Sequence, residues 1–165
     1  MIKMKENKKL CTLCKRIVNG NNTISLPNFI QNKKDDLYIL NEAVIHVDCI
    51  PNFGHKDKLH YILGEMKKNT APKDQQCIVD GTFSENFDDM LSLGLLSSNP
   101  SEDIYMYNFL NIKKSNISLW DNQERFVRIL KELKTSNSWL SDSSFNLIDY
   151  LISVFDITTI NNLTD

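Results

Sequence analysis

Three cysteines and one histidine constrain this chain more than any other part of its sequence. Cys11 and Cys14 form a Cys-x-x-Cys pair, and after 31 intervening residues His46 and Cys49 form a His-x-x-Cys pair. Two close pairs of this kind can converge on one tetrahedral ion, and three thiolates with one imidazole are a common ligand set for zinc. The spacing therefore predicts one zinc ion held by these four residues.

The same four residues favour a structural zinc over a catalytic one. A catalytic zinc normally keeps one coordination position open for water, whereas four protein ligands close the shell. The sequence also lacks a glycine-rich phosphate-binding loop and a Gly-x-Ser-x-Gly motif, so we expect a protein that is not an enzyme. No apolar run approaches the roughly 20 residues of a membrane span. Four cysteines without an apolar signal segment at residues 1–9 favour metal binding in a reducing, cytoplasmic compartment.

Residue patterns around the ligands predict a small zinc-binding unit over residues 11–70. A knuckle turn carries the first ligand pair, and short strands are expected at 23–30 and 37–40. A histidine and a cysteine three residues apart lie on one face of a helical turn, which would bring His46 and Cys49 together. Apolar residues then recur at helical spacing: Leu59, Ile62, Leu63 and Met66. The order of knuckle, β-hairpin and helix resembles a treble-clef zinc module.

The second half repeats this pattern at a shift of 66 residues, and one inserted residue later changes the shift to 67. Cys77 and Asp80 align with the first ligand pair, and Met90–Leu96 aligns with Ile24–Ile30 ahead of the insertion. After the insertion, the apolar stripe of the first helix recurs as Phe126, Ile129, Leu130 and Leu133. Repeats at a fixed offset usually mark duplicated structural units, so we expect a second copy over residues 77–135.

The second copy is expected to be free of metal. Its four ligand positions carry Cys77, Asp80, Lys113 and Asn116. A lysine side chain is protonated at neutral pH and has no lone pair for a metal ion. Aromatic packing is the expected substitute for the stabilisation that zinc provides in the first copy. A further hypothesis is that Asp80 and Lys113 pair across the vacated site.

Two flanking segments complete the predicted organisation. Residues 1–10 are expected to form a basic flexible arm, because lysines dominate them. Residues 139–157 are expected to hold a C-terminal helix, starting near Ser143 and ending near Phe155, that packs on the repeats. The predicted fold class is therefore α+β, with two tandem treble-clef-like units and an additional C-terminal helix.

Charge is distributed unevenly along the chain. Residues 1–70 carry five more basic than acidic side chains, and residues 71–165 carry seven more acidic than basic ones. Two solvated faces, a basic patch for an acidic partner, or head-to-tail self-association would each explain this pattern. Basic residues near the knuckle also permit contacts with nucleic-acid phosphates. The isoelectric point of about 5.9 and the lack of a base-reading helix argue against that alternative.

Nuclease chemistry is disfavoured by the position of the histidines. Treble-clef nucleases of the HNH type use a histidine in the hairpin as a general base, and residues 23–40 contain none. His55 and His60 are expected to have surface or capping roles. The carboxylate pairs Asp35–Asp36 and Asp88–Asp89 are expected in solvated turns, and Cys77 is expected to be a buried structural cysteine.

Three segments carry a resemblance to other proteins: residues 11–14, 37–41 and 44–49. They resemble small, uncharacterised bacterial proteins with a Cys-x-x-Cys/His-x-x-Cys module, some of which are accessory or immunity-type partners in bacterial conflict systems. The resemblance implies a zinc module in a bacterial or phage setting. We therefore expect a non-enzymatic, zinc-stabilised module that binds a partner protein, as an immunity or adaptor protein. The alternative is a zinc-dependent DNA- or RNA-binding protein that uses the basic N-terminal half.

Overall fold

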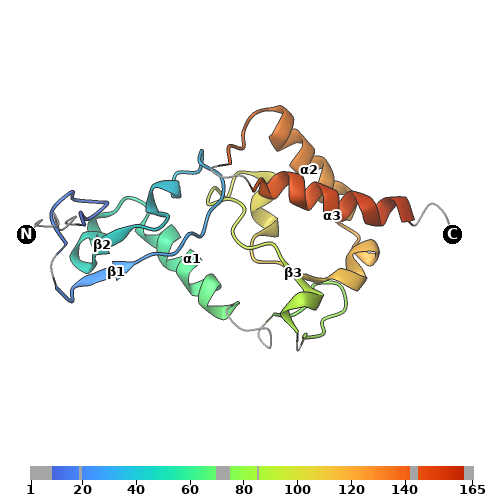
Figure 1. Cartoon of the computed structure of the whole chain (residues 1–165), viewed down its shortest axis with the longest axis horizontal. Helices are drawn as coiled ribbons and strands as arrows, with labels where there is room; N and C mark the ends of the chain where they lie inside the picture. The colour runs from blue at the N-terminus through green and yellow to red at the C-terminus, as the bar shows by residue number, and fades with distance from the viewer. Residues whose placement is uncertain (1–8, 19, 70–74, 85, 142–144, 162–165) are drawn as a thin grey trace, which may run out of the picture.

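The fold combines helices with two small antiparallel sheets, as the α+β prediction requires (Figure 1). The computed structural model describes residues 9–18, 20–69, 75–84, 86–141 and 145–161, so the arm expected over residues 1–10 lies largely outside the described residues. The molecule is elongated. The β1–β2 hairpin lies at one end and the helices α2 and α3 lie towards the other.

Apart from η4, the elements of the first half recur in the same order in the second. In the first half the elements are β1 (Thr23–Ser25), the 3-10 helix η1 (Tyr38–Leu40), β2 (Val44–His46), the 3-10 helix η2 (Val47–Asn52) and α1 (Lys56–Lys68). In the second half they are η4 (Phe87–Asp89), β3 (Met90–Ser92), η5 (Asp103–Tyr107), β4 (Asn111–Lys113), η6 (Lys114–Leu119) and α2 (Gln123–Thr135), followed by α3 (Leu147–Asn161). β1 pairs with β2, and β3 pairs with β4.

Both predicted strands of the first hairpin need correction. The strand expected over 23–30 ends at Ser25, two residues before Pro27, which cannot donate a backbone hydrogen bond to a sheet. Residues 37–40 form no strand. They contain η1, in which the N–H of Leu40 bonds the carbonyl of Leu37, three residues earlier. A run of four apolar residues does not distinguish a strand from a helical turn, and the true partner of β1 is β2.

A single asparagine side chain replaces the missing strand partner in each half. Asn41 accepts hydrogen bonds from the N–H groups of Phe29 and Ile30, at 3.1 Å each, and donates to the carbonyl of Ile30. Asn108 makes the same three bonds with Leu96 and Ser97. We call Asn41 and Asn108 the asparagine clamps. Each satisfies backbone groups that would otherwise lack partners.

The strand register places the inserted residue earlier than the sequence alignment does. Thr23 lies opposite His46, and Met90 lies opposite Lys113, so β1 and β3 are already offset by 67 residues. The knuckles keep the offset of 66, because the bridge between Leu10 and Ile17 recurs between Gln76 and Phe83. The extra residue therefore lies between the knuckle and the strand, and the alignment of Met90 with Ile24 was wrong by one position.

Each half has its own hydrophobic core. In the first half, Leu59 and Ile62 of α1 pack against buried residues around β2 and η1. In the second half, four aromatic rings form one cluster, with centroid distances of 4.9–5.7 Å between the rings in contact: Tyr107, Trp120, Phe126 and Phe155. Because Phe155 belongs to α3, the C-terminal helix completes this second core against α2 and η6.

Helix α3 begins at Leu147, four residues later than expected. The side chain of Asn146 accepts a hydrogen bond from the N–H of Ile148 at 3.1 Å, so Asn146 caps the helix. The expectation rested on the serine-rich segment 141–144, of which residues 142–144 lie outside the described residues. The helix also extends past Phe155 to Asn161.

The two halves meet along a seam of hydrogen bonds from residues 30–35. Asp35 accepts bonds from both the N–H and the hydroxyl of Ser98, at 2.7 Å each. The side chain of Asn32 bonds the backbone of Ser138 and Leu140. Leu95 of the second half is buried in the core of the first. Asp35 was expected to be solvated, and this expectation was wrong because its carboxylate joins the halves.

Replacing Asp35 with alanine is expected to destabilise the fold by about 1–3 kcal/mol, because it leaves the buried N–H of Ser98 without a partner. Asp36→Ala provides the matched control, since the neighbouring carboxylate is exposed, and its effect should stay within about 0.5 kcal/mol. Urea denaturation of both variants measures the difference. Equal free energies of unfolding would contradict the role of Asp35 at the seam.

Candidate metal centre

The first ligand pair lies on a tight turn that β2 holds in place. The N–H of Cys11 bonds the carbonyl of Arg16 at 2.8 Å, and the N–H of Lys15 bonds the carbonyl of Cys11 at 2.8 Å. Lys15 has a positive φ of 60°, as such a turn requires. The N–H of Thr12 bonds the carbonyl of Val44 at 3.0 Å, which fixes the turn beside β2.

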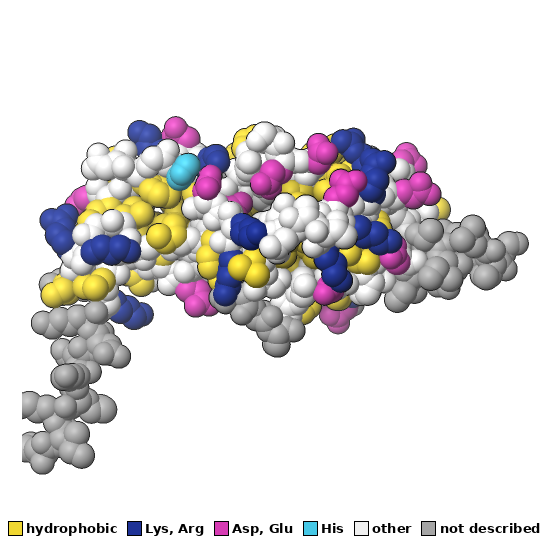
Figure 2. Space-filling model, turned by 90° about the horizontal axis from the view of Figure 1, so that it is seen from above, with side chains coloured by type: hydrophobic (Ala, Val, Ile, Leu, Met, Phe, Trp, Pro, Cys, Tyr) yellow, Lys and Arg dark blue, Asp and Glu magenta, His cyan; other side chains and the backbone are white. Residues whose placement is uncertain are grey.

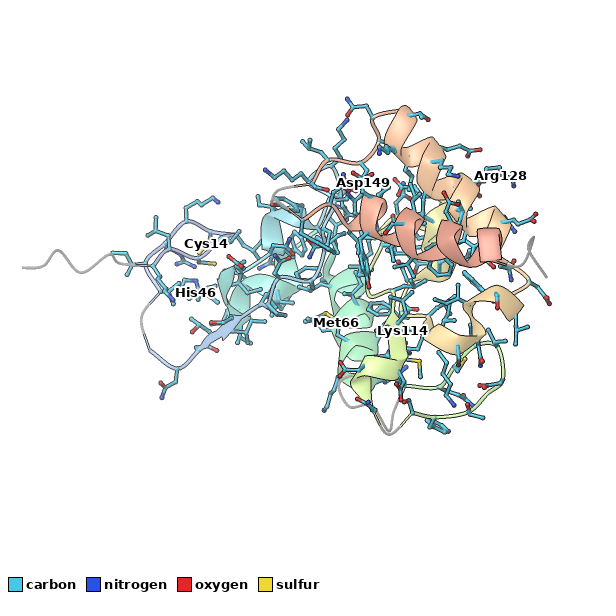
Figure 3. The ribbon with its side chains drawn as sticks, turned by 45° about the vertical axis from the view of Figure 1, so that its right-hand side comes forward. Cys14, His46, Met66, Lys114, Arg128 and Asp149 are labelled. Carbon is cyan, nitrogen blue, oxygen red and sulfur yellow. The ribbon has the colours of Figure 1, made fainter. Side chains whose placement is uncertain are left out.

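The second ligand pair spans the junction of a strand and a 3-10 helix. His46 is the last residue of β2, and Cys49 lies in η2. The expected placement on one helical turn was therefore only partly right. The short spacing still brings both side chains to the turn that carries Cys11 and Cys14, as Figure 3 shows for Cys14 and His46.

The four ligand atoms converge on one point. They all lie within 4.8 Å of one another. The Sγ atoms of Cys11 and Cys49 are 4.0 Å apart, and the Nδ1 atom of His46 lies 3.4 Å from Cys14 Sγ and 3.9 Å from Cys49 Sγ. A tetrahedral zinc ion with ordinary bond lengths would separate such atoms by about 3.6–3.8 Å. The residues present therefore fit a zinc ion bound through Nδ1 of His46.

The surroundings of the sulfur atoms favour the charged form of Cys14 and the neutral form of Cys49. The Arg16 side chain beside Cys14 lowers the pKa of that thiol to about 5. Burial and the neighbouring Cys14 and Cys11 raise the pKa of Cys49 to about 11. Three adjacent thiolates repel one another, and a divalent cation would offset their charge. Binding of a metal ion here would therefore release the proton of Cys49, because a thiol must lose its proton to become a ligand.

The equivalent positions of the second half hold a hydrogen-bonded network. Asn116 Nδ2 donates to Asp80 Oδ2 at 2.7 Å and lies 3.6 Å from the sulfur of Cys77. Asp80 Oδ1 also accepts bonds from the N–H and the hydroxyl of Thr82, at 3.0 and 2.7 Å. These donors, Thr82 first, hold the pKa of Asp80 well below its usual range.

The hypothesis that Asp80 pairs with Lys113 was wrong. The ammonium group of Lys113 donates to the hydroxyl of Thr82, and no ion pair with Asp80 occurs among the described residues. Asn116 instead reaches Asp80, because its short amide fits between Asp80 and Cys77. The network contains a carboxylate and an ammonium group, and a metal ion would require the ammonium group to move or lose its proton.

The remaining candidate residues lie away from the four ligands. His60 is exposed, and the ring of His55 packs against Phe53 at a centroid distance of 5.6 Å. Cys77 is buried, and its sulfur accepts the N–H of Lys113 at 3.4 Å. Asp88 and Asp89 are exposed, as expected for a solvated turn.

Sequence reasoning missed Arg16 and Thr82 as parts of the two sites. They occupy equivalent positions on the two knuckles, since their carbonyls accept the N–H groups of Cys11 and Cys77. Each interacts with the side chain two residues earlier: Arg16 with Cys14, and Thr82 with Asp80. A polar residue at this point of both knuckles was the available signal.

In the part of the chain that the structure describes, every helix is too short or too polar to cross a membrane.

Comparisons with known proteins leave the chain without an assigned relative. Comparisons with protein-family models, with curated proteins and with solved structures found no match.

Proposed function

We propose that this protein is a non-enzymatic, zinc-stabilised module that binds a partner protein. In this proposal it consists of two treble-clef-like units, one that holds structural zinc and one that folds without metal. The resemblance of the ligand segments to modules of bacterial conflict systems suggests an immunity or adaptor protein from a bacterial or phage setting.

The convergence of Cys11, Cys14, His46 and Cys49 carries the proposal. All four offer a ligand atom, so a tetrahedral ion would have no position left for water or substrate. An ion at this site would also tie the knuckle to the segment formed by β2 and η2, which lies further along the chain. A site with four protein ligands from separate segments would stabilise the fold and carry out no chemistry. The protein would then act through its surface, by binding a partner.

Exposed apolar side chains at equivalent positions support a role in protein binding. Ile39 of η1 and Met106 of η5 are 59% and 53% exposed, although each adjoins a buried core. Tyr61 on α1 is half exposed as well. Figure 2 shows apolar side chains lying between charged ones on one face of the molecule. Aromatic residues and methionine are enriched at protein interfaces.

Nucleic-acid binding is the second candidate, on the basis of the exposed lysines of the knuckle. Lys9 and Lys15 are exposed beside the metal centre and could contact phosphates. Arg16 contributes less to such a surface, because its side chain interacts with Cys14. If binding occurs through phosphates, the logarithm of the binding constant would fall linearly with the logarithm of the salt concentration.

Affinity capture from the lysate of source cells tests the two candidates against each other. The parent protein should retain a protein partner that the Ile39→Glu/Met106→Glu variant loses, and a variant with Lys9 and Lys15 changed to alanine should retain it. Retention of DNA or RNA at low salt, lost in the lysine variant alone, would support the second candidate instead. A partner retained equally by all three proteins would contradict the proposed surface.

A further inference from the structure

We infer that the second half keeps the geometry of a metal site and that Asn116 takes over the cross-linking role of the metal. This inference rests on the proposed pairing of a zinc-bearing unit with a metal-free unit. Asn116 occupies the position that Cys49 has in the first half. Each is the third residue after the end of its strand, Cys49 after β2 in η2 and Asn116 after β4 in η6.

The backbone around the two sites is nearly the same. The N–H of Cys77 bonds the carbonyl of Thr82 at 2.8 Å, and the N–H of Gly81 bonds the carbonyl of Cys77 at 2.9 Å, as in the first knuckle. The N–H of Ile78 bonds the carbonyl of Asn111 at 2.9 Å, where Thr12 bonds Val44. A turn held against a neighbouring strand in this way presents its side chains in the same directions as the first site does.

The retained cysteine makes the closest match between the sites. The sulfur of Cys77 accepts the N–H of Lys113 at 3.4 Å, and the sulfur of Cys11 accepts the N–H of His46 at the same distance. Both cysteines are buried. The ligand that is least accessible in the first site thus has an unchanged counterpart in the second.

Asn116 joins the two segments that the metal would join. Its Nδ2 group lies 2.7 Å from Asp80 Oδ2 on the knuckle and 3.6 Å from Cys77 Sγ, while its backbone belongs to η6. The ammonium group of Lys113 reaches the same knuckle through Thr82. Together these groups link the knuckle to β4 and η6 and supply a positive charge near Asp80 without a metal ion.

Restoring the ligands should therefore create a second zinc site. We expect the triple variant Asp80→Cys/Lys113→His/Asn116→Cys to bind two zinc ions per chain, measured by elemental analysis after dialysis against excess zinc, and the parent to bind one. A folded triple variant that still binds one zinc would overturn the inference. The zinc content of the parent tests the first site independently, since a parent without zinc would contradict the proposed function.

The role of Asn116 has a test that does not depend on the triple variant. Asn116→Ala should lower the melting temperature by about 3–6 °C, because Asp80 loses a donor and the knuckle loses its link to η6. Lys114→Ala changes an exposed neighbour on the same element and should shift it by less than about 1 °C. Equal shifts in the two variants would overturn the role of Asn116, whether or not the triple variant folds.

Discussion

Replacing Cys49 with serine is expected to abolish zinc binding and to unfold the first half of the molecule while the second half stays folded. Structural zinc contributes about 10–16 kcal/mol of apparent binding free energy in small fingers, which is comparable to the whole stability of an ordinary domain. The first half contains few buried aromatic rings to replace that contribution, whereas the second half has a cluster of four. Chelation of the metal should have the same effect.

Hydrogen exchange and zinc analysis together measure this outcome. Backbone amides of β1, β2 and α1 should lose their protection, and those of α2 should keep theirs. Cys77→Ser is the matched control, because it also replaces a cysteine with serine but leaves all four zinc ligands in place, so it should retain one zinc per chain. Simultaneous loss of protection in both halves of the Cys49 variant would mean that the seam makes them one cooperative unit.

Truncating Phe126 to alanine is expected to destabilise the second half by about 3–5 kcal/mol. Its ring is fully buried and contacts the rings of Tyr107, Trp120 and Phe155 at centroid distances of 4.9–5.5 Å. Removing it leaves a cavity among groups that belong to η5, α3 and the loop before α2, so the surroundings cannot easily collapse around the gap.

Thermal and urea denaturation of purified protein provide the measurement. Leu119→Ala is the control, since this leucine is 67% exposed and its truncation should change stability by less than about 0.5 kcal/mol. Zinc content should stay the same in both variants, because neither residue lies near the first site. A loss below about 1 kcal/mol for Phe126→Ala would show that the aromatic cluster does not supply the stability of the second half.

The elements that were predictable from the sequence are those with a local or periodic signal. The apolar stripes of α1 and α2 repeat at helical spacing over several turns, and both helices occur where they were expected. The ligands of the candidate centre were predictable from spacing alone, and the structure brings their atoms together. These features depend on residues that are close in sequence or rare in composition.

The features that could not be predicted depend on contacts between distant residues. The sequence of η1 is also typical of a strand. In the structure the side chain of Asn41 accepts the N–H groups of Phe29 and Ile30, so these groups need no neighbouring strand as a partner. Asp35 looked like a solvated acid because its partner, Ser98, lies 63 residues away. The choice of Asn116 over Lys113 as the partner of Asp80 likewise follows from side-chain reach, which spacing does not encode.

The asparagine clamps have a consequence for how such a chain can diverge. In each half a long segment connects the two paired strands, and the asparagine side chain joins the two ends of this segment. One amide group therefore holds the segment in place, instead of a continuous row of backbone hydrogen bonds. In the first half this segment carries both the exposed Ile39 and the seam residue Asp35. Substitutions at exposed positions of this segment, such as Ile39, can accumulate without moving β1, β2 or the metal ligands. Recognition and metal binding are thereby free to evolve at different rates within one small unit.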